Sequence, residues 1–259
     1  MWEFDAEYLR ETRRGMWADS REALSELELG TRDRVLDVGC GEGALTRVLR
    51  EETPGEVVGC DRDARLLAEL EGPTVQGDAY RLPFIDDSFD LVVCQALLIN
   101  LSDPKRALEE FVRVGHDHVA CIEPDNSAVT VESSVESERR LAEEARRRYL
   151  DGIETDVGLG AEAADLLRAV GLSDVTTTRY DQTLEIEPPY TEADVTAIRR
   201  KASGAGLRKR RGTMAGSEEA LDSLRSAWRE MGREAAEQLG RGEYRRVETV
   251  PFYVTVGRL

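Results

Sequence analysis

Three glycines spaced two apart follow a short apolar run and precede a helical stretch: Gly39, Gly41 and Gly43. Such a loop can hold a ligand, because a residue without a Cβ lets a bound molecule reach the backbone N–H groups at the start of the next helix. Asp37 lies within the apolar run, and Asp61 follows the next apolar run, 18 residues after Gly43. A carboxylate at the tip of the second strand suits both hydroxyls of a ribose. The spacing therefore predicts a site for a ligand that carries a ribose.

The following segment contains two further steps that belong with this loop. A Gly-Asp-Ala step occupies residues 77–79, and an Asp-Ser-Phe-Asp step at 87–90 leads into an apolar run. Together with the D-x-G-x-G-x-G pattern of residues 37–43, these steps resemble the class I S-adenosylmethionine-dependent methyltransferases, in the branch of the ubiquinone and menaquinone methyltransferases. The resemblance covers about residues 30–182 and the last strand.

The resemblance implies a cofactor, S-adenosyl-L-methionine, and a product, S-adenosyl-L-homocysteine. It implies that Asp78 accepts a hydrogen bond from the adenine amino group and that the Ala79 N–H faces the adenine ring. It also implies that Gln95, just past the fourth strand, lies beside the methyl donor. The predicted cofactor-binding residues are Asp37, Gly39, Cys40, Gly41, Gly43, Asp61, Arg62, Asp78, Ala79 and Gln95.

Three other functions are alternatives: an NAD(P)-binding oxidoreductase, an RNA methyltransferase and a non-catalytic S-adenosylmethionine-binding protein. The first is an alternative because Gly39-x-Gly41-x-x-Ala44 also fits the looser dinucleotide fingerprint. A nicotinamide enzyme, however, gains nothing from an acid two residues before the first glycine, whereas the ammonium and sulfonium of S-adenosylmethionine favour nearby acids. The Asn-Pro-Pro-Tyr motif of amino-methylating nucleic-acid enzymes is missing after the fourth strand.

Methyl transfer from a sulfonium mainly requires alignment of the reactants and exclusion of water, so it can proceed without an enzymatic nucleophile. The catalytic residue is therefore unknown. A base, if one is needed, should lie at the carboxyl ends of the strands, where Glu123 is a weak candidate. His116 and His118 fall at the opposite end of the fifth strand. Trp17 and Asn100 are weak candidates for contact with the methyl acceptor.

Strands and helices alternate over the first half of the chain, which predicts a parallel sheet. The expected fold is a single α/β methyltransferase domain over residues 1–259, a doubly wound, mostly parallel, seven-stranded Rossmann-like sheet with helical insertions and an antiparallel last strand. An amino-terminal helical cover is expected at 1–29, and the cofactor-binding core at 30–123. The expected strands are 56–60, 74–77, 89–94, 118–122, 175–180 and 250–256, in addition to the first at 35–38.

Two helical insertions, residues 124–160 and 185–245, are expected to form a substrate lid. The first contains a charged helix at 131–150, and the second a flexible step at 203–206 between two helices. Seven bases among residues 199–211 suggest contact with an anionic group on a small-molecule acceptor, for which Arg208 and Arg210 are the candidates. The alternatives are contact with RNA and a solvated surface.

The chain has 259 residues with 52 acids, 35 bases and a formal net charge of −17, and this field disfavours binding to nucleic acid. Its four cysteines lack metal-site or redox spacing, and no metal is expected. No apolar stretch is long enough for a membrane span, and the acidic amino end does not resemble a secretory signal. A cytoplasmic protein is expected, and the sequence does not determine its oligomeric state.

The charge also predicts dependence on salt, as in a halophilic protein. Self-repulsion destabilises a compact acidic chain, and it is screened over about 3 Å in 1 M salt. We expect the thermal midpoint to rise with salt concentration and the protein to unfold or aggregate in dilute buffer. A midpoint that does not change between dilute buffer and molar salt would contradict the halophilic interpretation.

Overall fold

The computed structural model describes residues 16–19 and 21–259, which form two compact units. The core unit comprises the described residues up to Asp125 together with Thr155–Tyr180 and Pro251–Leu259. The insert unit comprises Asn126–Glu154 and Asp181–Val250. Among the described residues, no helix is long and apolar enough to cross a membrane.

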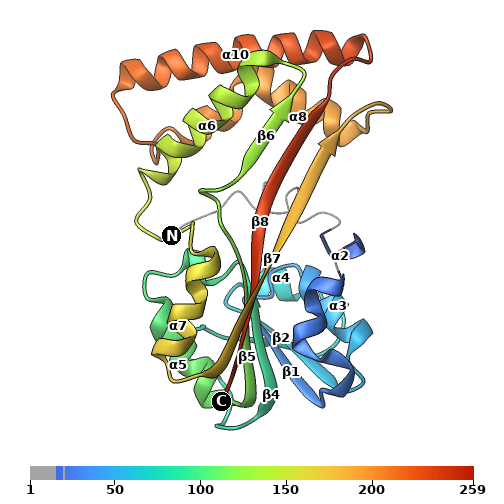
Figure 1. Ribbon diagram of the computed structural model, residues 1–259, viewed down its shortest axis with the longest axis vertical. Coiled ribbons are helices and arrows are strands. Elements are labelled where there is room, and N and C mark those ends of the chain that lie inside the picture. Colours follow the sequence, from blue (N-terminus) through green and yellow to red (C-terminus); the bar gives the residue numbers. More distant parts are fainter. Residues whose placement is uncertain (1–15, 20) are drawn as a thin grey trace. The chain divides into compact units, whose positions relative to one another are not determined.

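Five parallel strands form the centre of the core unit in the order β3-β2-β1-β4-β5 (Figure 1). They are β1 (Arg34–Val38), β2 (Glu56–Asp61), β3 (Thr74–Gln76), β4 (Phe89–Gln95) and β5 (Gly115–Pro124). The last strand, β8 (Arg246–Arg258), pairs antiparallel with β5, and β7 (Ser173–Ile186) pairs with β8. The doubly wound order and the antiparallel last strand are confirmed. The chain runs from β1 through β2 to β3 on one side of β1 and then crosses to β4 and β5 on its other side. The strand order therefore reverses between β1 and β4, and their carboxyl ends form the switch point of the sheet.

The sheet has eight strands among the described residues, so the prediction of seven was wrong. The additional strand is β6 (Thr130–Ser133), which pairs antiparallel with β8 from Thr130↔Thr249 to Ser133↔Arg246. The sequence predicted helix from residue 131, but helix α6 begins only at Glu136. Four residues are too short for a helical or strand periodicity to be distinguished, and their pairing with a distant strand decides the outcome.

Helices and short 3-10 helices connect these strands. In the core unit they are α2 (Met16–Asp19), η1 (Arg21–Leu27), η2 (Leu29–Thr31), α3 (Ala44–Glu52), α4 (Ala64–Leu67), η3 (Leu98–Asn100), α5 (Pro104–Val114), η4 (Gly160–Glu162) and α7 (Ala163–Ala169). Much of the expected amino-terminal cover, including Trp2, lies outside the described residues. Its described part is mostly 3-10 helix, with a short α-helix at Met16–Asp19.

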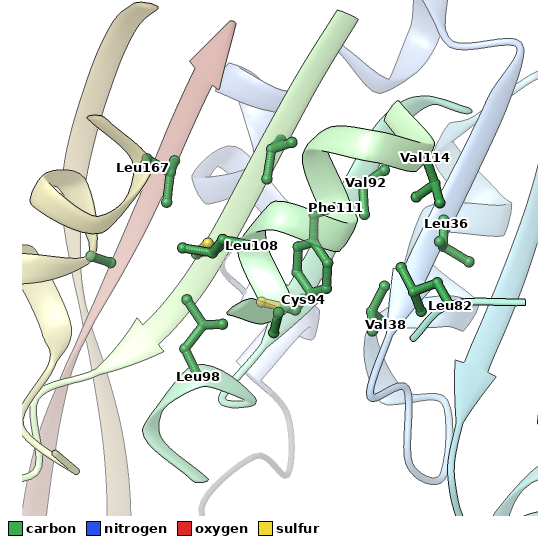
Figure 2. Close-up of a cluster of buried hydrophobic side chains, with 14 of the residues drawn as sticks. Leu36, Val38, Leu82, Val92, Cys94, Leu98, Leu108, Phe111, Val114 and Leu167 are labelled. Atoms are coloured by element: carbon green, nitrogen blue, oxygen red, sulfur yellow. The ribbon is translucent and has the colours of Figure 1, made fainter. Parts of the chain in front are cut away.

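The helix α5 buries its apolar face against the sheet. Asp103 caps it by accepting a hydrogen bond from the Arg106 N–H at 3.2 Å, and Pro104 follows in the first turn, as predicted. Figure 2 shows Leu108 and Phe111 of this helix among side chains of the strands, including Val92 and Cys94. Replacing a buried Phe such as Phe111 with Ala lowers the free energy of unfolding by about 3 to 5 kcal/mol. The packing of α5 on the strands is therefore important for the stability of the core unit.

The insert unit has its own apolar core. It contains β6, α6 (Glu136–Leu150), α8 (Glu192–Ser203), α9 (Ala205–Arg210) and α10 (Glu218–Gly240), and its core includes Leu141, Ile198, Met231 and Tyr244. The step at residues 203–206 contains a helix cap, and its flexibility stays a prediction. Gly204 has a left-handed conformation that ends α8 and begins α9, and Gly206 lies within α9. Glycine is favoured at this position because a Cβ clashes in the left-handed conformation.

A cluster of charged and polar side chains, three of them buried and two half-buried, lies within the insert unit. We call it the Glu138 cluster, and it consists of Glu138, Lys201, Tyr244, Arg246 and Glu248. The Glu138 carboxylate, 1% exposed, pairs with Lys201 and accepts hydrogen bonds from the Arg246 Nε at 3.1 Å and the Tyr244 hydroxyl at 2.8 Å. Burial lowers the pKa of Lys201 to about 8. Burial alone raises the pKa of Glu138, but the Lys201 and Arg246 charges outweigh it, so the pKa lies below its ordinary value.

Candidate functional site

The carboxyl ends of the parallel strands lie level with one another. Val38 of β1 is paired with Cys60 of β2 and with Cys94 of β4, and Cys94 is paired with Cys121 of β5. Residues that follow these positions therefore gather along one edge of the sheet. They are the glycine loop, Asp61, Gln95 and Glu123, with Asp78 just beyond β3. This edge contains the predicted cofactor-binding residues and the weak candidate for a base.

The glycine loop is attached to the end of β2. The N–H groups of Gly39 and Cys40 donate to the Cys60 carbonyl at 2.7 and 3.1 Å. All three glycines have positive φ, at +71°, +54° and +74°, where a side chain is strained. A Cβ at Gly43 would lie 1.9 Å from a Leu70 methyl carbon, whereas a Cβ at Gly41 would stand in open space. The tip of the loop thus has room for a ligand to approach the backbone.

Asp61 connects the end of β2 to this loop. Its Oδ2 accepts a hydrogen bond from the Gly41 N–H at 2.9 Å, and its Oδ1 accepts from the Asp63 N–H at 2.8 Å. The side chain is half-buried, so it borders both the protein and the space beside the loop. The open space at Gly41 lies beside this carboxylate. The carboxylate can accept hydrogen bonds from ribose hydroxyls, because an ionised carboxylate accepts and does not donate.

The predicted adenine contacts lie at the end of β3. Asp78 is exposed, and its Oδ1 accepts a hydrogen bond from the Tyr80 N–H at 2.9 Å, which fixes the turn that contains Ala79. Arg62 is exposed beside Asp61, and its carbonyl accepts a hydrogen bond from the Gln76 amide at 2.9 Å. These residues lie at the predicted edge, and their contacts with a cofactor stay predictions.

Asp37, at the end of β1, and Cys40, within the glycine loop, are both buried. The Asp37 side chain is 1% exposed, and its Oδ2 accepts a hydrogen bond from the Thr46 hydroxyl of α3 at 2.6 Å. This bond joins β1 to the helix after the glycine loop and holds the loop between them. Burial, together with the Asp37 and Asp61 charges, raises the pKa of the Cys40 thiol far above its ordinary value, so the thiol stays protonated and unreactive.

Gln95 is covered by residues from α2. The Trp17 indole N–H donates to the Gln95 Oε1 at 3.3 Å, and the Gln95 Nε2 donates to the Met16 sulfur at 3.1 Å. All three side chains are buried, with exposed fractions of 4% to 6%. The structure therefore brings two predicted residues, Trp17 and Gln95, together. Met16 was missed, because nothing in its spacing distinguishes it from an ordinary core residue.

The loop after β4 is held by Glu123 at the end of β5. The Glu123 side chain is fully buried, and its carboxylate accepts from the N–H groups of Leu97 at 3.1 Å, Leu98 at 2.9 Å and Ile99 at 3.4 Å. Asn100 ends this loop, and its Nδ2 donates to the Ala96 carbonyl at 2.8 Å. Asn100 thus lies near the predicted site, although its observed bond belongs to the loop.

The remaining candidates lie elsewhere. His116 contacts the Phe89 carbonyl at 2.7 Å and His118 contacts Asp117 at 2.8 Å, both at the amino end of β5, as predicted. Arg208 and Arg210 lie on α9 of the insert unit, where the Arg210 guanidinium lies over the Tyr149 ring. Lys201 is half-buried and pairs with Glu138, and Arg211 pairs with Asp222. Two of the seven bases thus pair with acids of the insert unit, and contact of the others with an acceptor stays a prediction.

Parts of this chain are similar to known methyltransferases. Residues 36–122 match the family model described as a methyltransferase domain. An uncharacterized methyltransferase of Schizosaccharomyces pombe is 34% identical over 134 residues, which cover 44% of this chain and 48% of that protein. A demethylmenaquinone methyltransferase of Lactiplantibacillus plantarum is 36% identical over 107 residues, which cover 36% and 45%. The matched segments thus span less than half the length of these curated relatives.

The fold of the whole chain also has solved counterparts. The crystal structure of an S-adenosylmethionine-dependent methyltransferase from Archaeoglobus fulgidus aligns with a TM-score of 0.54 and 16% identity. The alignment covers 99% of this chain and 100% of that chain. At this identity the likeness describes the fold.

Proposed function

The chain contains a class I S-adenosylmethionine-dependent methyltransferase domain, and on this premise we propose that the protein transfers a methyl group from S-adenosylmethionine to a small-molecule acceptor. The observation that carries the proposal is the glycine loop with open space at Gly41 and the Asp61 carboxylate hydrogen-bonded to it. A small-molecule acceptor is supported by the relatives that are named demethylmenaquinone methyltransferases.

Each cofactor-binding residue has a proposed role that follows from its place. Asp61 accepts from the ribose hydroxyls, and Asp78 with the Ala79 N–H borders the adenine. The glycine loop leaves space for the amino acid part of the cofactor, since side chains are absent where the ligand approaches. Cys40 lies within this loop, and Asp37 supports the loop through its hydrogen bond with Thr46. Arg62 follows Asp61 and is exposed.

The cofactor supplies a methyl group on a sulfonium, and an acceptor lone pair forms the new bond to carbon while the carbon–sulfur bond pair returns to sulfur. The protein aligns the two reactants and keeps water out. We assign this work to Gln95, Trp17 and Met16, and the support is that their side chains are buried and hydrogen-bonded to one another at the end of β4. Burial and hydrogen bonds of this kind do not support the prediction that Arg208 and Arg210 hold an anionic group on the acceptor.

Calorimetry in high salt tests the proposal. We expect S-adenosylmethionine and S-adenosylhomocysteine to bind and NAD(P)H not to bind. Incubation with a methyl-labelled donor and separate small-molecule and RNA fractions of a cell extract should then label a small molecule. Binding of the nicotinamide cofactor alone would favour the oxidoreductase, label in RNA would favour the RNA methyltransferase, and binding without any label would favour the non-catalytic protein.

The open space at Gly41 leads to a sharper prediction. Gly41→Ala places a methyl group where the ligand approaches the backbone, so we expect the affinity for S-adenosylhomocysteine to fall at least tenfold, which is about 1.4 kcal/mol. Gly242→Ala is the matched control, because Gly242 also has positive φ, +73°, with no neighbour near its Cβ position. Both variants carry the left-handed penalty of about 1 to 2 kcal/mol, but only the first should lose affinity. If Gly41→Ala bound S-adenosylhomocysteine as tightly as Gly242→Ala, the proposed position of the ligand beside Gly41 would be contradicted.

A further inference from the structure

The loop Gln95–Asn100 leaves β4 in a conformation that the chain does not favour by itself. Ala96 has φ of +46°, a left-handed conformation that is uncommon for a residue with a side chain. The backbone at this point is therefore held by its surroundings. The Ala96 N–H donates to the Ile122 carbonyl at 2.8 Å, and the next three N–H groups point toward Glu123.

Glu123 matches these donors by its chemistry. An ionised carboxylate has two oxygens that accept hydrogen bonds and no donor of its own, so it can receive three N–H groups at once. Its side chain is fully buried, where unpaired N–H groups are costly. Glutamine would retain one oxygen but would turn an NH₂ group toward the remaining N–H donors.

The same loop contacts the glycine loop. A Cβ built on Gly39 would lie 2.8 Å from the Leu97 Cδ1, so the Leu97 side chain lies directly against Gly39. Gln95, at the start of the loop, is bound by Trp17 and Met16. The backbone that Glu123 holds thus connects both parts of the candidate site.

The contacts of Glu123 argue against its role as a general base. A general base must come within hydrogen-bond reach of the acceptor. Glu123 is fully buried, and both of its oxygens already accept backbone N–H groups.

We propose that Glu123 is a positioning residue, whose carboxylate holds the backbone of residues 97–99 so that Leu97 supports the glycine loop in the geometry that binds S-adenosylmethionine. The inference rests on the proposed function for the identity of the ligand. The anchoring of the loop itself does not depend on it.

The test compares Glu123→Gln with the control Glu110→Gln. Glu110 also accepts a backbone N–H, from Leu82 at 2.8 Å, but on α5 and away from the loop. Hydrogen exchange of the ligand-free proteins should show faster exchange at Leu97–Ile99 in Glu123→Gln alone. The affinity for S-adenosylhomocysteine, measured by calorimetry, should fall about tenfold or more in the same variant, as expected when hydrogen bonds to a charged acceptor are lost.

Leu97→Ala provides a second variant if Glu123→Gln does not fold. It should weaken S-adenosylhomocysteine binding while Leu98 and Ile99 stay protected from exchange, and its effect on affinity should not add to that of Glu123→Gln. Unchanged exchange in Glu123→Gln would overturn the inference. So would unchanged cofactor affinity with lost methyl transfer, the pattern of a base. Wild-type protein that binds no S-adenosylhomocysteine would instead overturn the proposed function, and the exchange result would still decide the anchoring.

Discussion

Replacing Glu138 with alanine is expected to lower the free energy of unfolding of the insert unit by about 3 to 5 kcal/mol. The change removes the carboxylate that pairs with both Lys201 and Arg246, so Lys201 loses this partner and Arg246 keeps only its pairing with Glu248. It also removes the acceptor of the buried Tyr244 hydroxyl. Native-state hydrogen exchange in increasing urea, followed at the amides of α6 and α8, measures this unit separately from the core unit.

Glu136→Ala is the matched control for this prediction. Glu136 lies in the first turn of the same helix and is exposed, so its loss should change the unfolding free energy by no more than about 0.5 kcal/mol. Glu138→Gln should fall between the two, because the amide keeps an acceptor but not the charge. If Glu138→Ala were no more harmful than Glu136→Ala, the Glu138 cluster would not hold the insert unit together.

The second large effect concerns the cofactor. Asp61→Ala is expected to weaken binding of S-adenosylhomocysteine by about tenfold to a hundredfold, which corresponds to about 1.5 to 3 kcal/mol for hydrogen bonds to a charged acceptor. The variant loses the proposed ribose contact and also releases the Gly41 N–H that Asp61 holds at 2.9 Å. Calorimetry in high salt measures the affinity directly.

Asp90→Ala separates loss of binding from loss of structure. Asp90 also accepts backbone N–H groups, from Asp33 at 2.5 Å and Arg34 at 3.2 Å, but at the amino ends of the strands. Its replacement should lower the thermal midpoint and leave the affinity unchanged. An equal loss of affinity in both variants would mean that Asp61 acts only through the stability of the sheet.

The candidate site was predictable from the sequence where its parts are local. A strand, a glycine loop and a helix follow one another within residues 34–52, and Asp61 ends the next strand. Because the carboxyl ends of parallel strands share one edge, the alternation of strands and helices was sufficient to bring these residues together. The cap at Asp103 and Pro104 was likewise readable, since capping involves only the next few residues.

Contacts between distant segments could not be read in this way. The carboxylate of Glu123 and the backbone of Leu98 are 25 residues apart, and the sequence contains no sign that this acid faces N–H groups rather than an acceptor molecule. The strand β6 likewise exists because four residues pair with β8, more than 100 residues later. The energy of such a pairing depends on the partner strand and not on the propensity of the segment itself.

Lys201 shows most clearly what only the tertiary structure decided. In the sequence it is one of seven bases that suggest an exposed anion-binding surface. In the structure only 15% of its side chain is exposed, and it pairs with Glu138, which lies 63 residues away. The sequence around a charged residue does not show whether the side chain will be buried. Burial of a charge costs free energy unless a partner compensates it, and that partner can come from a distant part of the chain. The order of strands and helices in the sequence therefore predicted which residues gather at the edge that contains the glycine loop, whereas the packing of distant segments determined which charges pair with one another.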